Sequence, residues 1–398
     1  MSYSQAVTES VSREQELQHA GWDMVLLYVT FALLGIGLVM VMSASIPIAE
    51  KHLGQPFAFF QKQLLYVVLG LIAAYIVSRI PVQQWQKAGP VLLFLAFILL
   101  VAVLIPGIGK QVNGSMRWLP LGFINLQVSE LVKLIVYIYL AGYLVRRGEE
   151  VRSTLRGFLK PMIVLCLAVV LLLMEPDFGA AAVMLATALG MMYMSGVGLF
   201  KFAALIISTV SAMAMLALIS PYRVARILSF MNPWEDPYNS GFQLTQSLIA
   251  FGRGEWFGVG LGGSIQKLFY LPETHTDFLY AILAEELGLI GAILVIVLFA
   301  ILVWRAFMIG SHAEREQQYF AAYLAYGIGI WIGLQAFINI GVNMGVLPTK
   351  GLTLPLMSYG GSSIVVTLVA LGLLMRIGYE AENQDKLQAW SKKKRAAK

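Results

Sequence analysis

Ionisable side chains stand directly before a long apolar run in the stretch LPETHTDF (271–278). Asp277 would then lie at the N-terminus of a helix, where the helix dipole keeps a carboxylate ionised. An ionised and partly buried carboxylate is suited to act as a general base. A structural alternative is open, because Thr276 or Asp277 can also cap the first amides of the helix. Glu273 and His275 are close enough in the sequence to shape the same site.

Charged residues also interrupt apolar runs at two other places, where they are costly and therefore of functional interest. Glu130 and Lys133 are three residues apart and share one helix face. They form either a buried structural ion pair or a polar cavity in which Lys133 contacts an anionic ligand. In EPDFG (175–179), Asp177 can cap a helix, and Glu175 with Asp177 could hold a divalent cation such as magnesium or manganese. Two carboxylates without a third ligand do not predict a metal site, so no cofactor is assigned.

Motifs that bind nucleotides or present a serine nucleophile are missing. The sequence has neither GxxxxGK[ST] nor GxSxG, and GVGLGGS (258–264) does not follow a strand. SYGGSS (358–363), which contains Ser358, is interpreted as a close-packed turn. Any group transfer would therefore need a donor already activated outside the cell, such as a polyprenyl-pyrophosphate-linked sugar. Cationic side chains could neutralise the pyrophosphate, and the candidates are Arg117, Lys133, Arg223, Arg226 and Lys267.

The elements that must position these residues are membrane helices. Hydrophobic residues make up 59% of the 398 residues and charged residues 13%, with a mean hydropathy of +0.75. This composition excludes an ordinary soluble domain. The alternation of a transmembrane barrel is absent. The sequence therefore predicts an all-α polytopic membrane protein with about ten helices that cross ~30 Å of hydrocarbon, at residues 22–44, 58–79, 89–107, 127–145, 160–175, 178–196, 199–220, 277–304, 318–343 and 357–376.

The distribution of lysine and arginine indicates the orientation. If both termini are cytoplasmic, the inside segments carry roughly twice as many of these residues as the outside segments. We expect a cytoplasmic N-terminal segment (1–21), a membrane domain (22–376) and a basic cytoplasmic tail (377–398) that attracts membrane lipids rather than nucleic acid. Residues 221–276 form one large extracytoplasmic loop, too long for a simple connector, with a short amphipathic helix over Gly241–Ala250.

Several stretches resemble the SEDS family, and together they cover nearly the whole membrane region. They are GSMRWLPLGFINLQVSELVKL (114–134), EPDFG (175–179), MNPWEDPYNSGFQLTQSLIAFGRGEWFGVGLG (231–262), KLFYLPETHTDFLYAILAEELGLIGA (267–292) and GVLPTKGLTLPLMSYGGSS (345–363). The phrases QKLFYLPETHTDF and LPTKGLTLPLMSYGGSS are more similar to the cell-division branch of the family than to its elongation branch. The chain departs from the family pattern at Glu175, which puts a strict need for a second carboxylate in doubt, and at Phe269, which receives no role in the chemistry.

The resemblance implies roles for individual residues. The family's essential aspartate corresponds to Asp277, which is expected to be catalytic. Matches to the family motifs, together with neighbouring polar residues, give the expected substrate-binding set: Arg117, Trp118, Glu130, Lys133, Asp177, Arg223, Arg226, Gln243, Gln246, Lys267, Glu273, His275, Thr276 and Ser358.

The resemblance also implies an activity. Members of the family are peptidoglycan glycosyltransferases that polymerise lipid II, so Asp277 is expected to be the general base of an inverting transfer with undecaprenyl pyrophosphate as the leaving group. The implied partners are a class B penicillin-binding protein of the FtsI-type transpeptidase kind and other divisome membrane proteins, in the bacterial cytoplasmic (inner) membrane at the division septum. Two alternatives are a lipid II flippase and a non-catalytic divisome scaffold.

Overall fold

The computed structural model describes residues 21–112, 115–122, 124–198, 230–239, 241–349 and 351–396, and the single positions 203, 207, 211 and 215. Eight helices in this part of the chain are long and apolar enough to cross a membrane. They are α2 (Met24–Leu53), α3 (Ala58–Arg79), α4 (Val82–Leu104), α5 (Val128–Ser153), α6 (Leu155–Met174), α11 (Leu279–Arg315), α12 (Tyr319–Asn343) and α13 (Gly361–Ala396). The shorter helices are α7 (Phe178–Met194) and α10 (Phe242–Gly254).

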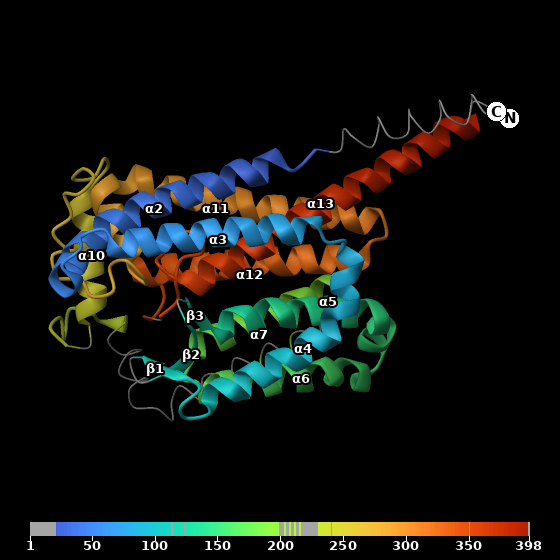
Figure 1. Ribbon diagram of the computed structural model, residues 1–398, viewed down its shortest axis with the longest axis horizontal. Coiled ribbons are helices and arrows are strands. Elements are labelled where there is room, and N and C mark those ends of the chain that lie inside the picture. Colours follow the sequence, from blue (N-terminus) through green and yellow to red (C-terminus); the bar gives the residue numbers. More distant parts are fainter. Residues whose placement is uncertain are drawn as a thin grey trace.

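The prediction of an all-α polytopic fold is confirmed. Nine of the ten expected spans coincide with these helices, whereas the span expected at 199–220 lies outside the described residues. In Figure 1, α2 begins and α13 ends at the same end of the bundle, as expected for termini on one side of a membrane. The boundary expected at residue 377 falls within α13, which continues to Ala396.

The helices divide into an inner and an outer set. The most apolar window is 83% buried in α5, 72% in α12 and 78% in α13, but only 22% in α3 and in α4. Figure 1 shows α3 and α4 running along the outside of the bundle. Their exposed apolar faces are suited to lipid, whereas polar side chains on α5 and α12 are enclosed by protein.

A small sheet between α4 and α5 was not expected from the sequence. It is antiparallel in the order β1 (Lys110–Val112), β2 (Ser115–Leu121), β3 (Ile124–Gln127), and Trp118 pairs with Gln127. The turn between β2 and β3 contains Gly122 with φ 74°, a backbone conformation that glycine adopts without steric cost. A glycine between two apolar runs is a hairpin signal, and it places the RW pair on the central strand.

Helix α11 is interrupted near its first third. Gly288 has φ 68° and ψ −166°, and residues 255–260 lie beside the break. Their backbones exchange hydrogen bonds: Val259 N donates to Glu285 O (3.0 Å), and Leu289 N donates to Glu255 O (2.9 Å). Non-helical backbone at membrane depth is tolerated only where protein satisfies its polar groups. The loop therefore completes α11 and fixes its first turns.

Replacing Gly288 with alanine should destabilise the protein. The new Cβ would lie 2.6 Å from the carbonyl carbon and oxygen of Trp256, and the positive φ disfavours any L side chain. We expect the free energy of unfolding to fall by more than about 2 kcal/mol, measured as a lower melting temperature of the purified protein. Gly35→Ala is the control, because nothing lies within 4 Å of its Cβ position in α2. Equal melting temperatures for the two variants would contradict the role assigned to the break.

Candidate functional site

Asp277 lies at the entrance to α11, partly exposed, at the end of the loop 271–278. The N-cap position belongs to Phe278, which makes no side-chain capping bond. The Thr276 hydroxyl instead donates to Glu273 Oε2 at 2.6 Å. Thr276 is therefore not the N-cap residue of α11, and its hydroxyl closes the preceding turn.

Two buried asparagines of α12 hold the backbone of Asp277. Asn339 Nδ2 and Asn343 Nδ2 each donate to the carbonyl oxygen of Asp277 at 2.9 Å. Asn343 Oδ1 also accepts a hydrogen bond from Ala281 N at 3.0 Å. The sequence reasoning missed both residues, although amides within an otherwise apolar span are a usable signal.

The same face of α12 carries a third amide, Gln335, one turn before Asn339. Lys133 Nζ donates to Gln335 Oε1 at 3.0 Å and to Glu130 Oε1 at 2.9 Å. The side chain of Lys133 is completely buried and its ammonium lies 5.1 Å from the centre of the Trp331 ring. We call Gln335, Asn339 and Asn343 the amide ladder. Its successive members are four residues apart, which is about 6 Å along a helix, and together they join the Glu130–Lys133 pair to Asp277.

A second charged cluster lies where β2 meets the α6–α7 junction. Asp177 caps α7 by accepting a hydrogen bond from Ala180 N at 3.2 Å, as expected, and it also accepts one from Ser129 Oγ at 2.9 Å. Arg117 approaches the Asp177 carboxylate at 3.9 Å and donates to the Glu175 carbonyl oxygen at 3.1 Å. Ser129 precedes Glu130 on α5, so this cluster borders the Glu130–Lys133 pair.

Glu175 is fully buried in the same cluster. Neither of its carboxylate oxygens has a hydrogen-bond partner among the described residues. Burial, followed by the nearby Asp177 carboxylate, raises the pKa of Glu175 to about 8. The side chain is therefore mostly neutral at pH 7 and does not add a second negative charge beside Asp177.

Residues 351–361 cover Asp277 from the other side. A Cβ built on Gly351 would lie 3.2 Å from Asp277 Oδ2, so this glycine faces the carboxylate directly. Ser358 Oγ accepts a hydrogen bond from Leu354 N at 2.9 Å, and its carbonyl accepts one from Gln63 Nε2 at 3.0 Å. Ser358 is thus buried in a hydrogen-bonded turn, as its interpretation as a turn residue predicted.

His275 belongs to an aromatic cluster rather than to a charged one. Its ring centre lies 4.8 Å from that of Phe59 and 5.5 Å from that of Tyr359. The carbonyl of His275 accepts a hydrogen bond from Tyr359 N at 2.8 Å. Burial lowers the pKa of His275, against the opposing effect of Glu273. The imidazole is therefore neutral near pH 7. The ring contact and the carbonyl of His275 together tie the loop to Tyr359.

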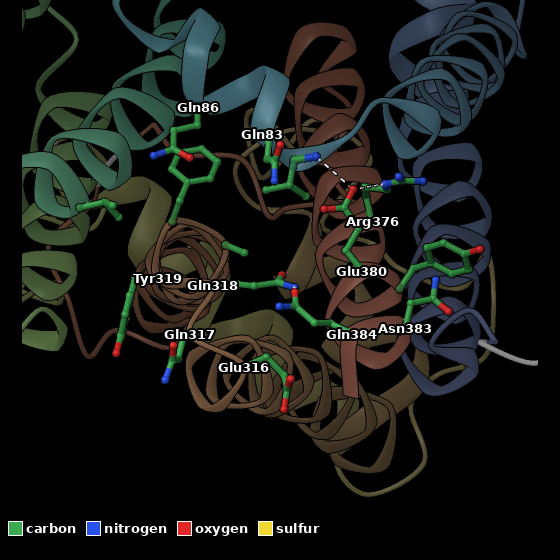
Figure 2. A pocket seen from close by; sticks show the side chains of 15 residues that line it. Gln83, Gln86, Glu316, Gln317, Gln318, Tyr319, Arg376, Glu380, Asn383 and Gln384 are labelled. Carbon is green, nitrogen blue, oxygen red and sulfur yellow. Dashed lines mark hydrogen bonds and ion pairs between the residues drawn. The ribbon is translucent and has the colours of Figure 1, made fainter. Parts of the chain in front are cut away.

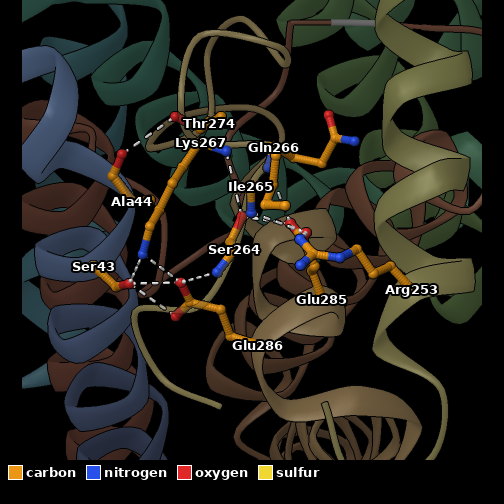
Figure 3. Close-up of polar contacts among 10 residues, drawn as sticks. All are labelled: Ser43, Ala44, Arg253, Ser264, Ile265, Gln266, Lys267, Thr274, Glu285 and Glu286. Carbon is orange, nitrogen blue, oxygen red and sulfur yellow. Dashed lines mark hydrogen bonds and ion pairs between the residues drawn. The ribbon is translucent and has the colours of Figure 1, made fainter. Parts of the chain in front are cut away.

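Lys267 lies in a separate polar network that fastens the loop to α2 and α11 (Figure 3). Its ammonium donates to Glu286 Oε1 at 2.7 Å and to Ser43 Oγ at 2.9 Å. The neighbouring Glu285 pairs with Arg253 of α10 at 2.7 Å. Lys267 is buried and its charge is already balanced, so the structure gives it a role in holding the loop.

The other expected site residues lie as follows. Trp118 is on β2, next to Arg117, and is partly exposed. Gln243 and Gln246 are partly exposed on α10, whose position agrees with the short helix expected near 241–250. Arg223 and Arg226 lie outside the described residues. The structure thus brings together Arg117, Glu130, Lys133 and Asp177, and links them to Asp277 through α12.

A divalent cation does not fit the described carboxylates. No group of three His, Cys, Asp or Glu side chains suited to a metal ion occurs among the residues that were searched. Asp177 is engaged with Ser129 and with the start of α7.

A cavity lies at the other end of the bundle, where α13 ends (Figure 2). It measures about 820 Å³ and lies between the start of α4, the α11–α12 turn and α13. Its lining includes Gln83, Gln86, Gln318, Arg376 and Glu380. None of the expected site residues lines this cavity.

The fold and the site together define a polytopic α-helical membrane protein with a charged site at the end of the bundle opposite the termini. A family of cell cycle proteins, FtsW/RodA/SpoVE, matches residues 24–383. The chain therefore belongs to the FtsW/RodA/SpoVE family, which confirms the resemblance to SEDS proteins.

Relatives and solved structures agree with this membership. The chain is 57% identical over 366 residues to a protein of Thioalkalivibrio sulfidiphilus named probable peptidoglycan glycosyltransferase FtsW, covering 92% of each chain. It is 60% identical to the protein of that name from Nitrosococcus halophilus, covering 90% of this chain and 92% of the relative. Such identities confirm the expected similarity to the cell-division branch.

The fold matches two solved proteins over almost the whole chain. One comes from work on the structural coordination of polymerization and crosslinking by a peptidoglycan synthase complex, with a TM-score of 0.74, 27% identity, and coverage of 91% of this chain and 98% of that chain. The other is the rod shape determining protein RodA of Thermus thermophilus, with a TM-score of 0.66, 26% identity, and coverage of 90% and 97%.

Removing the positive charge of Lys133 should destabilise the protein strongly. Lys133→Met leaves the buried Glu130 carboxylate without its cation, and breaking one side of a buried pair costs about 3–5 kcal/mol. The double variant Lys133→Met/Glu130→Gln leaves no buried charge and should regain most of the lost melting temperature. If the double variant melts as low as the single variant, the two side chains do not compensate each other's charge.

The raised pKa of Glu175 predicts a pH-dependent stability. Because the folded state holds the proton up to about pH 8 and the unfolded state releases it near pH 4.3, stability falls as pH rises between these values, by at most about 1.4 kcal/mol per pH unit. Glu175→Gln mimics the protonated form and should lack this part of the slope. Melting temperatures from pH 5 to 8 test this, and parallel curves for the two proteins would contradict it.

Proposed function

We propose that this protein is a peptidoglycan glycosyltransferase that polymerises lipid II, with Asp277 as its general base. The observation that carries the proposal is the partly exposed Asp277 carboxylate beside Gly351, on a residue whose main-chain carbonyl is held by two asparagines, at the end of the bundle expected to face outward. Relatives that cover about nine-tenths of the chain bear the name probable peptidoglycan glycosyltransferase FtsW. Neither the base nor the leaving group is given by those names.

The reaction is an inverting glycosyl transfer. Asp277 accepts the proton of the 4-hydroxyl of the acceptor sugar, and that oxygen attacks the anomeric carbon of the donor's muramic acid. The bond from the anomeric carbon to the pyrophosphate oxygen breaks, the electron pair leaves with undecaprenyl pyrophosphate, and a β-1,4 bond forms. One carboxylate is sufficient, because pyrophosphate leaves without a general acid.

Cations near the site stabilise the negative charge that develops on the leaving group. Among the candidates that the structure describes, Arg117 is the accessible one, since a quarter of its side chain is exposed. Lys133 is closed off from solvent in this structure, so it would contact pyrophosphate only after the site opens between α5 and α12. Lys267 is better suited to hold the loop, because Glu286 already neutralises it.

The lipid tails account for the site's location in a membrane protein. Substrates that carry polyprenyl chains arrive sideways from the bilayer, and exposed aromatic residues such as Trp234 and Trp256 suit a loop at the membrane surface. A class B penicillin-binding protein of the FtsI type would crosslink the product at the septum of the cytoplasmic membrane. Other divisome membrane proteins complete the proposed set of partners.

A lipid II flippase is the second candidate, and the 820 Å³ cavity at the cytoplasmic end is the observation that favours it. A flippase needs polar groups at both faces, and this cavity contains Arg376 and Glu380. Supplying lipid II only on the outer side separates the two functions, because a polymerase makes glycan from it and a flippase does not. The scaffold alternative predicts that Asp277→Ala still supports division in cells.

Asp277→Asn should abolish most polymerisation by the purified protein. The amide keeps the shape of the side chain but cannot accept the proton, and a positioned base is worth roughly 10²–10⁴-fold in rate. Glycan synthesis from lipid II, with and without the partner transpeptidase, measures the effect. Glu150→Gln makes the same chemical change at an exposed carboxylate away from the site and should keep the wild-type rate. A wild-type rate for Asp277→Asn would remove Asp277 from the chemistry.

A further inference from the structure

We propose that Asn339 and Asn343 are positioning residues that hold Asp277 outside α11 and fix the direction of its carboxylate. This inference rests on the proposed role of Asp277 as the general base. It concerns how the base is placed, which neither the family membership nor the relatives' names address.

Asn343 takes the place of a helical hydrogen bond. In a regular helix, the amide of Ala281 would donate to the carbonyl four residues earlier, which is that of Asp277. Here Ala281 N donates to Asn343 Oδ1 at 3.0 Å, and Asn343 Nδ2 donates to Asp277 O at 2.9 Å. Ala281 N also approaches Phe278 O at 3.1 Å, three residues earlier, and no bond from it to Asp277 O forms. One carboxamide therefore bridges the two backbone groups that would otherwise bond each other. An inserted side chain of this kind opens a helical turn, which explains why α11 begins at Leu279.

Asn339 supplies a second donor to the same carbonyl and connects it to the opposite wall of the site. Its Nδ2 lies 2.9 Å from Asp277 O and 2.6 Å from Leu352 O. Leu352 follows Gly351, which faces the Asp277 carboxylate. The two donors occupy both lone pairs of the Asp277 carbonyl, so this peptide unit cannot rotate without breaking two partly buried hydrogen bonds.

The two asparagines are also held by each other. Asn343 Nδ2 donates to Asn339 O at 2.8 Å, and the exposed fraction is 2% for Asn339 and 0% for Asn343. Buried amides are costly in a membrane protein unless they are satisfied. A helix start could be capped at lower cost by a local serine or aspartate. The use of two buried asparagines at this position is therefore explained if the site requires Asp277 to lie outside the helix.

The test compares polymerisation of lipid II by the full-length wild type, Asn339→Leu, Asn343→Leu and the double variant. Leucine keeps the size and removes the amide. Each rate is divided by the amount of protein that binds lipid II, so that misfolded material does not count. Thr30→Val is the matched control, because it removes a buried side-chain hydrogen bond, from Thr30 Oγ1 to Leu26 O, in the first two turns of α2. Asp277→Asn is assayed in parallel.

Each single variant should lower kcat about tenfold, the worth of one buried hydrogen bond, with KM unchanged within about twofold. The double variant should lose more than the product of the two single effects, because it alone leaves the Asp277 carbonyl with no side-chain donor. If the double variant is not monodisperse, the kcat and KM of the two single variants decide the test. If Asp277→Asn is inactive, two results overturn the inference. One is a kcat within twofold of wild type in the asparagine variants, and the other is a loss of activity that appears in KM instead of kcat. An active Asp277→Asn would instead overturn the proposed function.

Discussion

A polar group inside this bundle must find its partner within the protein, because the hydrocarbon of a membrane offers none. The amide ladder on α12 is the clearest consequence. Gln335 satisfies Lys133 and the Thr353 carbonyl, and Asn339 and Asn343 satisfy the backbone of Asp277. Three amides at intervals of four residues thus place a cation, a carboxylate and the segment around residue 352 along one helix. The candidate site exists in this form because these bonds cannot be exchanged for water.

The same constraint explains the start of α11 and the break within it. The break at Gly288 is completed by backbone groups of residues 255–260, and the adjacent Glu285 and Glu286 are neutralised by Arg253 and Lys267. The large loop is therefore fastened to the helix that it precedes, and LPETHTDF is held between this fastening and α12. A general base on a free loop would sample many directions, whereas transfer chemistry needs the carboxylate in a narrow range of positions.

The sequence predicted the helices well because their signal is local and strong. Long charge-free windows require membrane helices, and the cap role of Asp177 follows from its place before an apolar run. The hairpin that carries Arg117 and Trp118 was missed, since its short strands lie among apolar residues that also suit a helix. Asn339 and Asn343 were missed because their importance depends on contacts with residues about sixty positions away. Lys267 was expected near pyrophosphate, yet only the fold reveals that Glu286 is its neighbour.

The central claim is that the charged cluster and Asp277 form one site at the end of the bundle opposite the termini. An experimental structure of the full-length protein with a bound lipid II analogue tests it most directly. The account predicts that a sugar hydroxyl lies within hydrogen-bond reach of the Asp277 carboxylate and that the pyrophosphate lies nearest Arg117 and Lys133. A headgroup bound instead in the cavity beside Arg376 and Glu380, with nothing near Asp277, would contradict the account.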